Sequence, residues 1–219
     1  MGNIADILGI EAVKKDPKVA VLRCNGSCEF RPQTNDYDGA VSCAVAASLY
    51  GGTTGCQYGC LGCGDCEASC KFDALHMNPL TGLPEVIDDT CVSCGACVKA
   101  CPKNLFELRR KAPKDRKIYV ACRNEDKGGI ARKTCSVACI GCSKCEKECK
   151  YEAITMANNL AFIDADKCKL CRKCVSVCPT NSIIEVNFPP RKITLNEQPL
   201  MVEKVTETMA GKPANTSEI

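Results

Sequence analysis

The sequence has no tryptophan, a single histidine and only 5% aromatic residues, so we expect a thin conventional apolar core. It also has no long hydrophobic run, because the apolar stretch at residues 39–52 is well short of the roughly 18 to 20 residues that a membrane-spanning helix needs. Residues 1–15 contain neither an apolar segment nor a small-residue cleavage site, so no export signal is visible. These absences predict a cytoplasmic chain that does not itself span a membrane.

Cysteine is the residue that the sequence has in excess, with 22 among 219 residues. In a secreted chain these thiols would indicate a disulfide framework, whereas in a cytosolic chain thiols at short fixed spacings indicate metal sites. We therefore expect bound metal, rather than large side chains, to fill much of the interior.

Most of the cysteines form four copies of the run C-x2-C-x2-C-x3-C. The agreement extends beyond cysteine, because "CKFDALHM" matches "CKYEAITM" and "CVKACPKNLFEL" matches "CVSVCPTNSIIEV". We interpret the chain as an internal duplication of a unit that contains two runs. The four runs are Cys60, Cys63, Cys66 and Cys70; Cys91, Cys94, Cys97 and Cys101; Cys139, Cys142, Cys145 and Cys149; and Cys168, Cys171, Cys174 and Cys178.

This spacing is typical of [4Fe-4S] clusters. Three cysteines of a run can bind three corners of a cubane, and the fourth ligates the other cluster of a two-cluster ferredoxin, so the pairing is crossed. Zinc is the alternative metal, but zinc sites usually take two C-x2-C pairs with a spacer and do not need the outlying fourth cysteine. The four expected ligand sets are Cys60, Cys63, Cys66 with Cys101; Cys91, Cys94, Cys97 with Cys70; Cys139, Cys142, Cys145 with Cys178; and Cys168, Cys171, Cys174 with Cys149.

Proline follows the fourth cysteine in only two runs, at Pro102 and Pro179, whereas Lys71 and Lys150 take that position in the other two. Proline fixes φ and removes a donor but supplies no ligand, so its absence should leave cluster binding intact. We expect the two lysines to be solvated; the alternative is that they offset the charge of a cluster.

Short apolar segments between the runs predict a small α+β unit. Residues 74–88 and 153–164 each read as a β-hairpin, residues 105–108 and 183–186 as closing strands, and the last two cysteines of the second and fourth runs as helical turns. The expected fold class is α+β, with two tandem two-[4Fe-4S] bacterial ferredoxin-like domains at residues 57–110 and 139–188 and small flanking α/β segments. The flanks are a cysteine-containing segment at 1–56, a basic linker and repeat-2 flank at 111–138, and a flexible tail at 189–219.

The basic stretch at residues 109–117 has two interpretations. It is either a solvated connector or a docking patch for an acidic redox partner, whose encounter an opposite charge would speed.

Six cysteines lie outside the runs. Cys24, Cys28, Cys43 and Cys56 precede the first unit and form a quartet, for which we hypothesise a fifth iron–sulfur cluster, with buried free thiols as the alternative. Cys122 and Cys135 precede the second unit, and this pair has too few ligands for a cluster, so a structural role is expected. The flanks belong to the duplication, because "KVAVLRC" resembles "KIYVAC" and Cys56-x3-Cys60 matches Cys135-x3-Cys139.

The residues point to electron transfer rather than substrate chemistry. No G-x-G-x-x-G or Walker motif is present, so nucleotide and flavin sites are not indicated, and no catalytic His/Asp set is recognisable. His76 is expected to be structural, with proton-coupled tuning of a cluster as the alternative. Two other functions are open: a soluble polyferredoxin, or ferredoxin subunit of a dehydrogenase or hydrogenase, and a zinc-stabilised interaction module. The lack of an interleaved basic and aromatic surface argues against nucleic acid.

Four segments resemble a known family. "VAVLRCNGSCEFRPQTNDYDGAVSC", "GCQYGCLGCGDCEASCKFDAL", "RKIYVACRNEDKGG" and "VACIGCSKCEKECKYEAIT", in this order, resemble the B subunit of the Rnf-type ion-translocating ferredoxin:NAD oxidoreductase. The resemblance runs from about Asn3 to Lys192. Members of that family start with a membrane helix and a further cluster motif, neither of which this sequence contains, and "GNIADILGIE" resembles the sequence just downstream of them.

The resemblance implies a role in a membrane complex that passes electrons from reduced ferredoxin towards NAD while moving sodium ions or protons. The chain would be an electron-transfer subunit of this translocase without a substrate site of its own, peripheral on the cytoplasmic face of the membrane. NAD and flavin would be bound by other subunits, and the family's cluster ligands map onto the sixteen cysteines of the runs.

Overall fold

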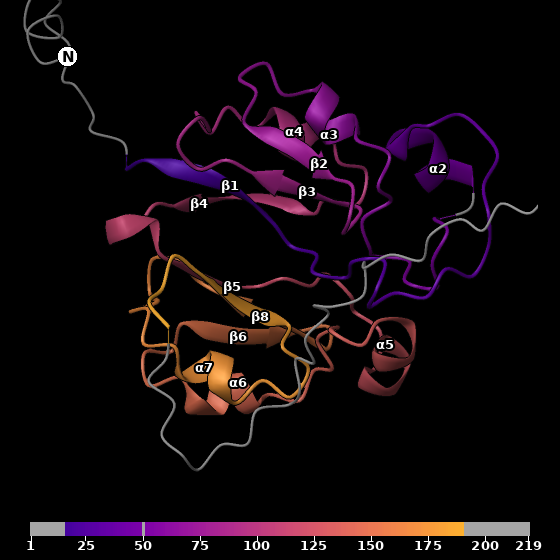
Figure 1. The fold of residues 1–219 in the computed structure, drawn as a ribbon. Helices are drawn as coiled ribbons and strands as arrows, with labels where there is room; N and C mark the ends of the chain where they lie inside the picture. The colour runs from indigo at the N-terminus through magenta and orange to yellow at the C-terminus, as the bar shows by residue number, and fades with distance from the viewer. Residues whose placement is uncertain (1–15, 50, 191–219) are drawn as a thin grey trace, which may run out of the picture. The chain divides into compact units, whose positions relative to one another are not determined.

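The computed structural model describes residues 16–49 and 51–190 of the chain (Figure 1). Most of the expected flexible tail at 189–219, and the first fifteen residues of the N-terminal segment, lie outside this range. Among the described residues no helix has the length and apolarity that crossing a membrane requires. The described residues from Asp16 to Phe188 fall in one compact unit.

Each repeat contains the expected β-hairpin. Strand β2 (Leu75–Asn78) pairs antiparallel with β3 (Leu83–Val86), and β6 (Ile154–Ala157) pairs antiparallel with β7 (Leu160–Ile163). The second hairpin turns at Asn158 and Asn159, whose φ angles of 48° and 60° are those of a tight turn that matches the strand twist. Both hairpins are confirmed.

The closing strands are also present. Each one pairs with a strand that precedes the first cysteine run of the same repeat. Strand β4 (Phe106–Arg110) pairs antiparallel with β1 (Lys18–Leu22), and β8 (Ile183–Val186) pairs antiparallel with β5 (Lys117–Val120). The similarity between "KVAVLRC" and "KIYVAC" therefore marks a structural equivalence, because these segments supply β1 and β5. Each ferredoxin-like unit uses a strand from outside the boundaries expected for it.

Short helices follow the second cysteine of every run and carry the third. They are α3 (Asp65–Ala68), α4 (Ala96–Ala100), α6 (Lys144–Glu148) and α7 (Lys173–Ser176). Two further helices, α2 (Cys43–Leu49) and α5 (Gly128–Thr134), lie in the segments that precede the first run of each repeat, and a single 3-10 turn, η1 (Pro113–Asp115), joins the repeats. The fold is thus the α+β arrangement of short strands and helical turns that the sequence predicts.

Cysteine makes up much of the core. The largest group of buried apolar side chains combines Ile118, Ile154 and Ile163 with five cysteines, Cys122, Cys135, Cys139, Cys145 and Cys174. A smaller group packs Val19 and Val21 of β1 against Tyr119 and Ala121 at β5. The aromatic-poor composition is consistent with this interior, in which thiols take the place of large side chains.

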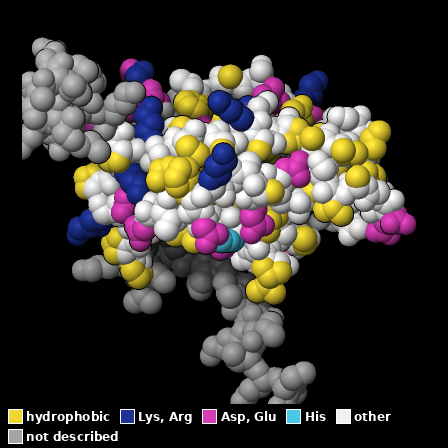
Figure 2. All heavy atoms as spheres, turned by 90° about the horizontal axis from the view of Figure 1, so that it is seen from above, with side chains coloured by type: hydrophobic (Ala, Val, Ile, Leu, Met, Phe, Trp, Pro, Cys, Tyr) yellow, Lys and Arg dark blue, Asp and Glu magenta, His cyan; other side chains and the backbone are white. Residues whose placement is uncertain are grey.

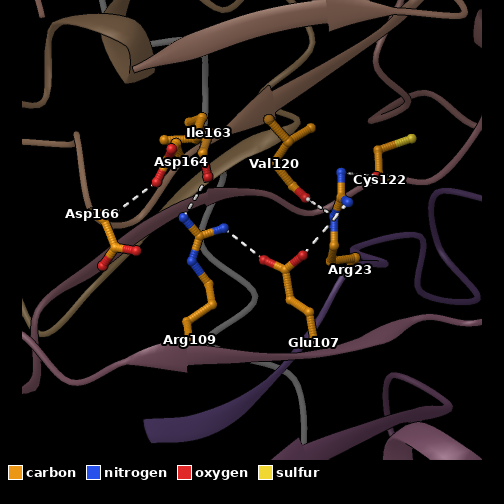
Figure 3. A network of polar contacts seen from close by, with 8 residues as sticks. All are labelled: Arg23, Glu107, Arg109, Val120, Cys122, Ile163, Asp164 and Asp166. Atoms are coloured by element: carbon orange, nitrogen blue, oxygen red, sulfur yellow. Dashed lines mark hydrogen bonds and ion pairs between the residues drawn. The ribbon is translucent and has the colours of Figure 1, made fainter. Parts of the chain in front are cut away.

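Two side chains of the basic stretch between the repeats, Arg109 and Lys117, are buried, whereas Arg110 and Lys114 are exposed (Arg109 in Figure 3). Arg109, only 5% exposed, donates to the Ile163 carbonyl at 2.6 Å and pairs with Glu107 at 2.6 Å. Arg23 reaches the other oxygen of Glu107 at 3.6 Å and the Val120 carbonyl at 3.3 Å. Lys117, also buried, forms an ion pair with Asp88. Arg109 and Lys117 therefore connect the two repeats, while the solvated-connector and docking-patch interpretations remain predictions for the exposed Arg110 and Lys114.

Candidate iron–sulfur centres

All four runs share one backbone conformation. In each, the residue before the second cysteine and the residue after it have positive φ, between 54° and 85°. The eight residues are Gly62 and Gly64, Ser93 and Gly95, Gly141 and Ser143, and Leu170 and Arg172. The glycines at half of these positions carry this signal in the sequence, since glycine takes positive φ without strain.

Positive φ at alternate residues is a conformation in which successive backbone N–H groups can line a common concave side. Alternation of right- and left-handed residues forms nests that bind anions, including iron–sulfur clusters. Leu170 and Arg172 adopt it although a left-handed conformation costs a non-glycine residue roughly 1–2 kcal/mol. The fourth run therefore keeps the shape of the site against its own conformational preference.

Three cavities are each lined by one of the expected crossed quartets. The remaining lining is mostly apolar, with Leu75, Val86 and Leu108 around the first and Met156 and Ile183 around the second. The three sets of cysteines are Cys91, Cys94, Cys97 and Cys70; Cys139, Cys142, Cys145 and Cys178; and Cys168, Cys171, Cys174 and Cys149. In each case the fourth thiol comes from the other run of the same repeat.

The remaining quartet has an additional neighbour. Cys66 lies close enough to Cys101 for their charges to interact, and Cys60 lies similarly close to Cys66. Cys43, at the start of α2, forms a thiol hydrogen bond with Cys63 and also lies near Cys66. The first run therefore has Cys43 beside it in addition to its four expected ligands.

Asp65 explains why Cys43 lies there. Its carboxylate accepts hydrogen bonds from the Ser42 hydroxyl at 3.0 Å and from the Ala44 backbone N–H at 3.1 Å, which caps the N-terminus of α2. Asp65 stands between the second and third cysteines of the run, so this cap fixes α2 to the first run. Lys144 takes the equivalent position in the third run and cannot accept such bonds.

Burial raises the pKa of several of these thiols. The pKa of Cys60, Cys66 and Cys174 rises to about 12, with burial as the largest cause and nearby thiols adding to it. Without metal such thiols are protonated at neutral pH. Iron binding then has to displace protons, as is usual for thiolate ligands.

Cys178 departs from this pattern. Burial acts to raise its pKa, but hydrogen bonds from the Ser182 hydroxyl and from the backbone N–H groups of Thr180 and Ile183 outweigh it, so the pKa lies below its ordinary value. The sulfur lies 3.3 Å from the Ser182 hydroxyl oxygen. At the equivalent position of the first repeat stands Leu105, which offers the Cys101 sulfur its backbone N–H at 3.4 Å and no hydroxyl.

The turn after the fourth cysteine is the same with and without proline. The third residue beyond that cysteine has positive φ in every run, namely Asp73, Asn104, Glu152 and Asn181 at 50° to 53°. Lys71 and Lys150 are exposed, in line with the solvated interpretation. Proline is therefore not required for this backbone path.

The six cysteines outside the runs have three kinds of surroundings. Cys43 contacts the first run, beside Cys63. Cys28 is exposed, and its thiol donates to the Thr81 carbonyl at 3.7 Å. The others, Cys24, Cys56, Cys122 and Cys135, share surroundings at the junction of the repeats. The quartet hypothesised from the sequence, Cys24, Cys28, Cys43 and Cys56, is thus divided among all three.

His76 stands in β2 with its side chain 44% exposed (Figure 2, cyan). Its ring nitrogens lie 3.5 Å from Glu67 and 3.2 Å from the Asp73 carbonyl oxygen. It belongs to a surface cluster with acidic residues and takes no place in the cavities lined by the quartets.

The donor set fits a cubane. Each of the three quartets that line a cavity combines four thiols with mostly apolar walls and the positive-φ pattern of a backbone nest. A [4Fe-4S] core with four thiolates carries a charge of about −2, which the N–H groups of such a nest would stabilise. Among the described residues no three His, Cys, Asp or Glu side chains are grouped to hold one metal ion.

Comparison with known proteins first defines the class. A family model described as a 4Fe-4S dicluster domain matches residues 59–105 and 138–182, one match in each repeat. The chain thus contains two iron–sulfur domains of the two-cluster ferredoxin type.

Similarity to curated proteins then defines the family. The chain is 41% identical to the B subunit of the ion-translocating oxidoreductase complex of Methanosarcina acetivorans, over 83% of this chain and 67% of that protein. It is 47% identical to the B subunit of the Na⁺-translocating ferredoxin:NAD⁺ oxidoreductase complex of Acetobacterium woodii, over 82% of this chain and 53% of that protein. The corresponding subunit of the proton-translocating complex of Clostridium ljungdahlii is 42% identical over 83% of this chain and 63% of that protein. The chain belongs to this family of B subunits, and it spans about half the length of the Acetobacterium relative.

Proposed function

We propose that this chain is an iron–sulfur subunit that relays electrons from reduced ferredoxin towards NAD within an ion-translocating membrane oxidoreductase complex. Its family membership supports this function, and so do the three cavities lined by crossed thiol quartets, the observation that carries most weight. When bound, the clusters supply one-electron transfer at low potential. The chain contributes no substrate-catalytic site of its own, and NAD, flavin and the translocated ion belong to other subunits.

We assign four [4Fe-4S] clusters to the sixteen cysteines of the runs, in the crossed sets given above. The first set, Cys60, Cys63, Cys66 and Cys101, rests on the equivalence of the four runs and on the proximity of Cys66 to Cys101. The positive-φ pattern supports the same role for every run, because it recurs at the same two positions.

Exposed cysteines define where electrons pass between this chain and its partners. The second cysteines of the last three runs, Cys94, Cys142 and Cys171, are exposed. Cys63 of the first run is partly buried and has Cys43 of α2 beside it. The edges at Cys94, Cys142 and Cys171 can approach a redox partner, and the remaining thiols of these sets are partly or fully buried.

The partners follow from the same proposal. Soluble ferredoxin is the electron donor, and the other subunits of the complex hold the chain peripherally on the cytoplasmic face of the plasma membrane. The names of the Acetobacterium and Clostridium relatives, which specify ferredoxin and NAD⁺, support this assignment.

Mixing the anaerobically purified full chain with reduced ferredoxin tests the donor. The visible absorbance of the protein should bleach within the mixing time as the clusters accept electrons, and dithionite should add little further bleaching. Bleaching by dithionite alone, with none from ferredoxin, would contradict the proposed donor.

Affinity purification from detergent-solubilised membranes tests the complex. We expect a tagged chain to bring down membrane-spanning subunits and an NAD-binding subunit in stoichiometric amounts. Recovery of the chain alone, or with a dehydrogenase or hydrogenase, would favour the polyferredoxin alternative.

A further inference from the structure

Four of the cysteines outside the runs occupy equivalent positions in the two repeats. Cys24 follows β1 by two residues as Cys122 follows β5, and Cys56 precedes the first run as Cys135 precedes the third. Each repeat therefore brings one pair of thiols, and each pair alone is too small to hold a cluster.

Contacts between the repeats bring Cys24 and Cys122 together. The backbone N–H of Asn25 donates to the Ala121 carbonyl at 3.0 Å. The residues adjacent to Cys24 and Cys122 in the chain are therefore hydrogen-bonded to each other. Arg23 strengthens the junction, because its guanidinium donates to the Cys122 carbonyl at 3.3 Å (Figure 3).

Cys56 and Cys135 meet in the same way. A β-carbon placed on Gly55 would lie 3.6 Å from the Thr134 methyl group, so the residues immediately before the two cysteines are in contact. On the other side, the Ser136 N–H donates to the Phe30 carbonyl at 3.1 Å.

Asn124 joins the two pairs. It is 1% exposed, its backbone N–H donates to the Cys122 sulfur at 3.4 Å, and its side-chain amide donates to the Cys56 sulfur at 3.6 Å. Cys24 also lies close enough to act electrostatically on Cys56, Cys122 and Cys135, so the four thiols gather at one place between the repeats.

The sulfurs there receive the same hydrogen bonds as the cluster ligands assigned above. Backbone N–H groups two residues downstream donate to Cys56, Cys122 and Cys135, as they do to Cys60 and Cys168 in the runs. Cys122 accepts a second bond, from the Cys139 N–H at 3.3 Å. Such N–H donors stabilise thiolate sulfur bound to iron.

A buried cation lies beside these thiols. Arg31, 6% exposed, donates to the Gly26 and Cys60 carbonyls, the latter at 2.8 Å, and acts electrostatically on Cys56 and Cys135. In the part of the chain that the structure describes, no carboxylate forms an ion pair with it. A buried charge calls for a counter-charge, and four thiolates around a [4Fe-4S] core supply a net charge of about −2.

We propose that Cys24, Cys56, Cys122 and Cys135 bind a fifth [4Fe-4S] cluster at the junction of the two repeats. The site goes beyond the proposed function, which needs only the four clusters of the runs. Asn124 and Arg31 position and balance it, and Cys28 and Cys43 take no part.

Metal content of the full chain, purified anaerobically, tests the site. Iron, acid-labile sulfide and zinc are measured for the unaltered protein, for Cys122→Ser, and for Cys28→Ser as the matched control. We expect about 20 iron atoms per chain in the unaltered protein and the control, and about 16 in Cys122→Ser. About 16 in the unaltered protein, full retention in Cys122→Ser, or stoichiometric zinc would each overturn the proposal.

Native mass spectrometry of the unaltered protein counts the clusters directly, so it tests the site even if the Cys122→Ser variant fails to fold. A mass with five clusters supports the site even if Cys122→Ser loses most of its iron, and a mass with four contradicts it. Four clusters would leave the electron relay of the runs intact, whereas a protein without iron would overturn both, so the two failures are distinguishable.

Discussion

The first and third runs have the same spacing and backbone but different surroundings. The first is covered by α2, with Cys43 beside Cys63 and Asp65 capping the helix. At the third run the start of α5 lies against Ile140, where a β-carbon placed on Gly128 would meet the Ile140 carbonyl, but Cys142 is exposed. The cover comes from a longer connection, since Cys24 and Cys56 are 32 positions apart and Cys122 and Cys135 only 13. Cysteine spacing defines the site, and the connecting segment decides how far a partner can reach it.

The fourth cysteines differ in a smaller way. Cys178 has the Ser182 hydroxyl beside its sulfur, whereas Cys101 has Leu105 at the equivalent position. A hydroxyl donor stabilises negative charge on sulfur, and hydrogen bonds to sulfur are among the factors that set cluster potential. The two repeats therefore offer equivalent clusters with different expected potentials.

The crossed pairing gives the largest predicted effect. Cys70→Ala and Cys94→Ala should each remove one cluster, about 4 iron atoms, and the double variant should still lose only about 4 because both thiols serve the same cluster. The pair Cys63→Ala and Cys94→Ala should lose about 8. Iron and sulfide analysis of the purified variants distinguishes the two patterns. A loss of about 8 from the first pair would show that pairing is not crossed.

Removing the cap of α2 should expose the first run. Asp65→Ala deletes an N-cap, which typically costs about 1 kcal/mol of unfolding free energy. We expect the cluster at Cys63 to be lost faster under air, approaching the rate at the third run, whose Cys142 is exposed, as followed by visible absorbance. Lys144→Ala, at the equivalent position, is the control and should change neither stability nor decay. Equal decay in the two variants would mean that α2 does not shield the first run.

Removing the Ser182 hydroxyl should lower the reduction potential of the cluster that Cys178 ligates. If the hydrogen bond favours the reduced cluster by about 1 kcal/mol, Ser182→Ala lowers the potential of the cluster at Cys178 by about 40 mV. A redox titration followed by EPR measures this shift. Ser176→Ala, which removes a hydroxyl bonded only to the Lys173 carbonyl, should leave all potentials in place. A shift of the same size in both variants would rule out the assigned hydrogen bond.

The smallest effect is expected when proline is introduced after the fourth cysteine of the first run. Lys71→Pro places in the first run the residue that the second and fourth runs already have, on a backbone with the same turn. Iron content should be unchanged and the unfolding free energy should change by less than about 1 kcal/mol. Loss of iron in this variant would show that the four turns are not equivalent.

The sequence predicted the regular parts of the fold well. The hairpins, the closing strands and the α+β class follow from short apolar segments between turns, and β2–β3 and β6–β7 lie where those segments are. The partners of β4 and β8 were not predicted, although residues 18–24 resemble residues 117–122, because strand pairing depends on contacts distant in the chain.

The six cysteines outside the runs show that sequence order alone does not predict which cysteines lie together. The sequence groups Cys24, Cys28, Cys43 and Cys56 because they are consecutive, and sets Cys122 and Cys135 aside as a pair. In the structure Asp65 draws Cys43 to the first run, while Asn124 joins Cys56 to Cys122 across 66 positions. Both contacts use single polar side chains whose partners no local pattern specifies.

Iron and acid-labile sulfide per chain, measured on the anaerobically purified protein together with EPR before and after dithionite, test the central claim most directly. At least about 16 iron atoms with matching sulfide, and signals of interacting reduced [4Fe-4S] centres only after reduction, are the predicted result. Stoichiometric zinc with no EPR signal would contradict it, and would replace the electron relay with a zinc-stabilised module.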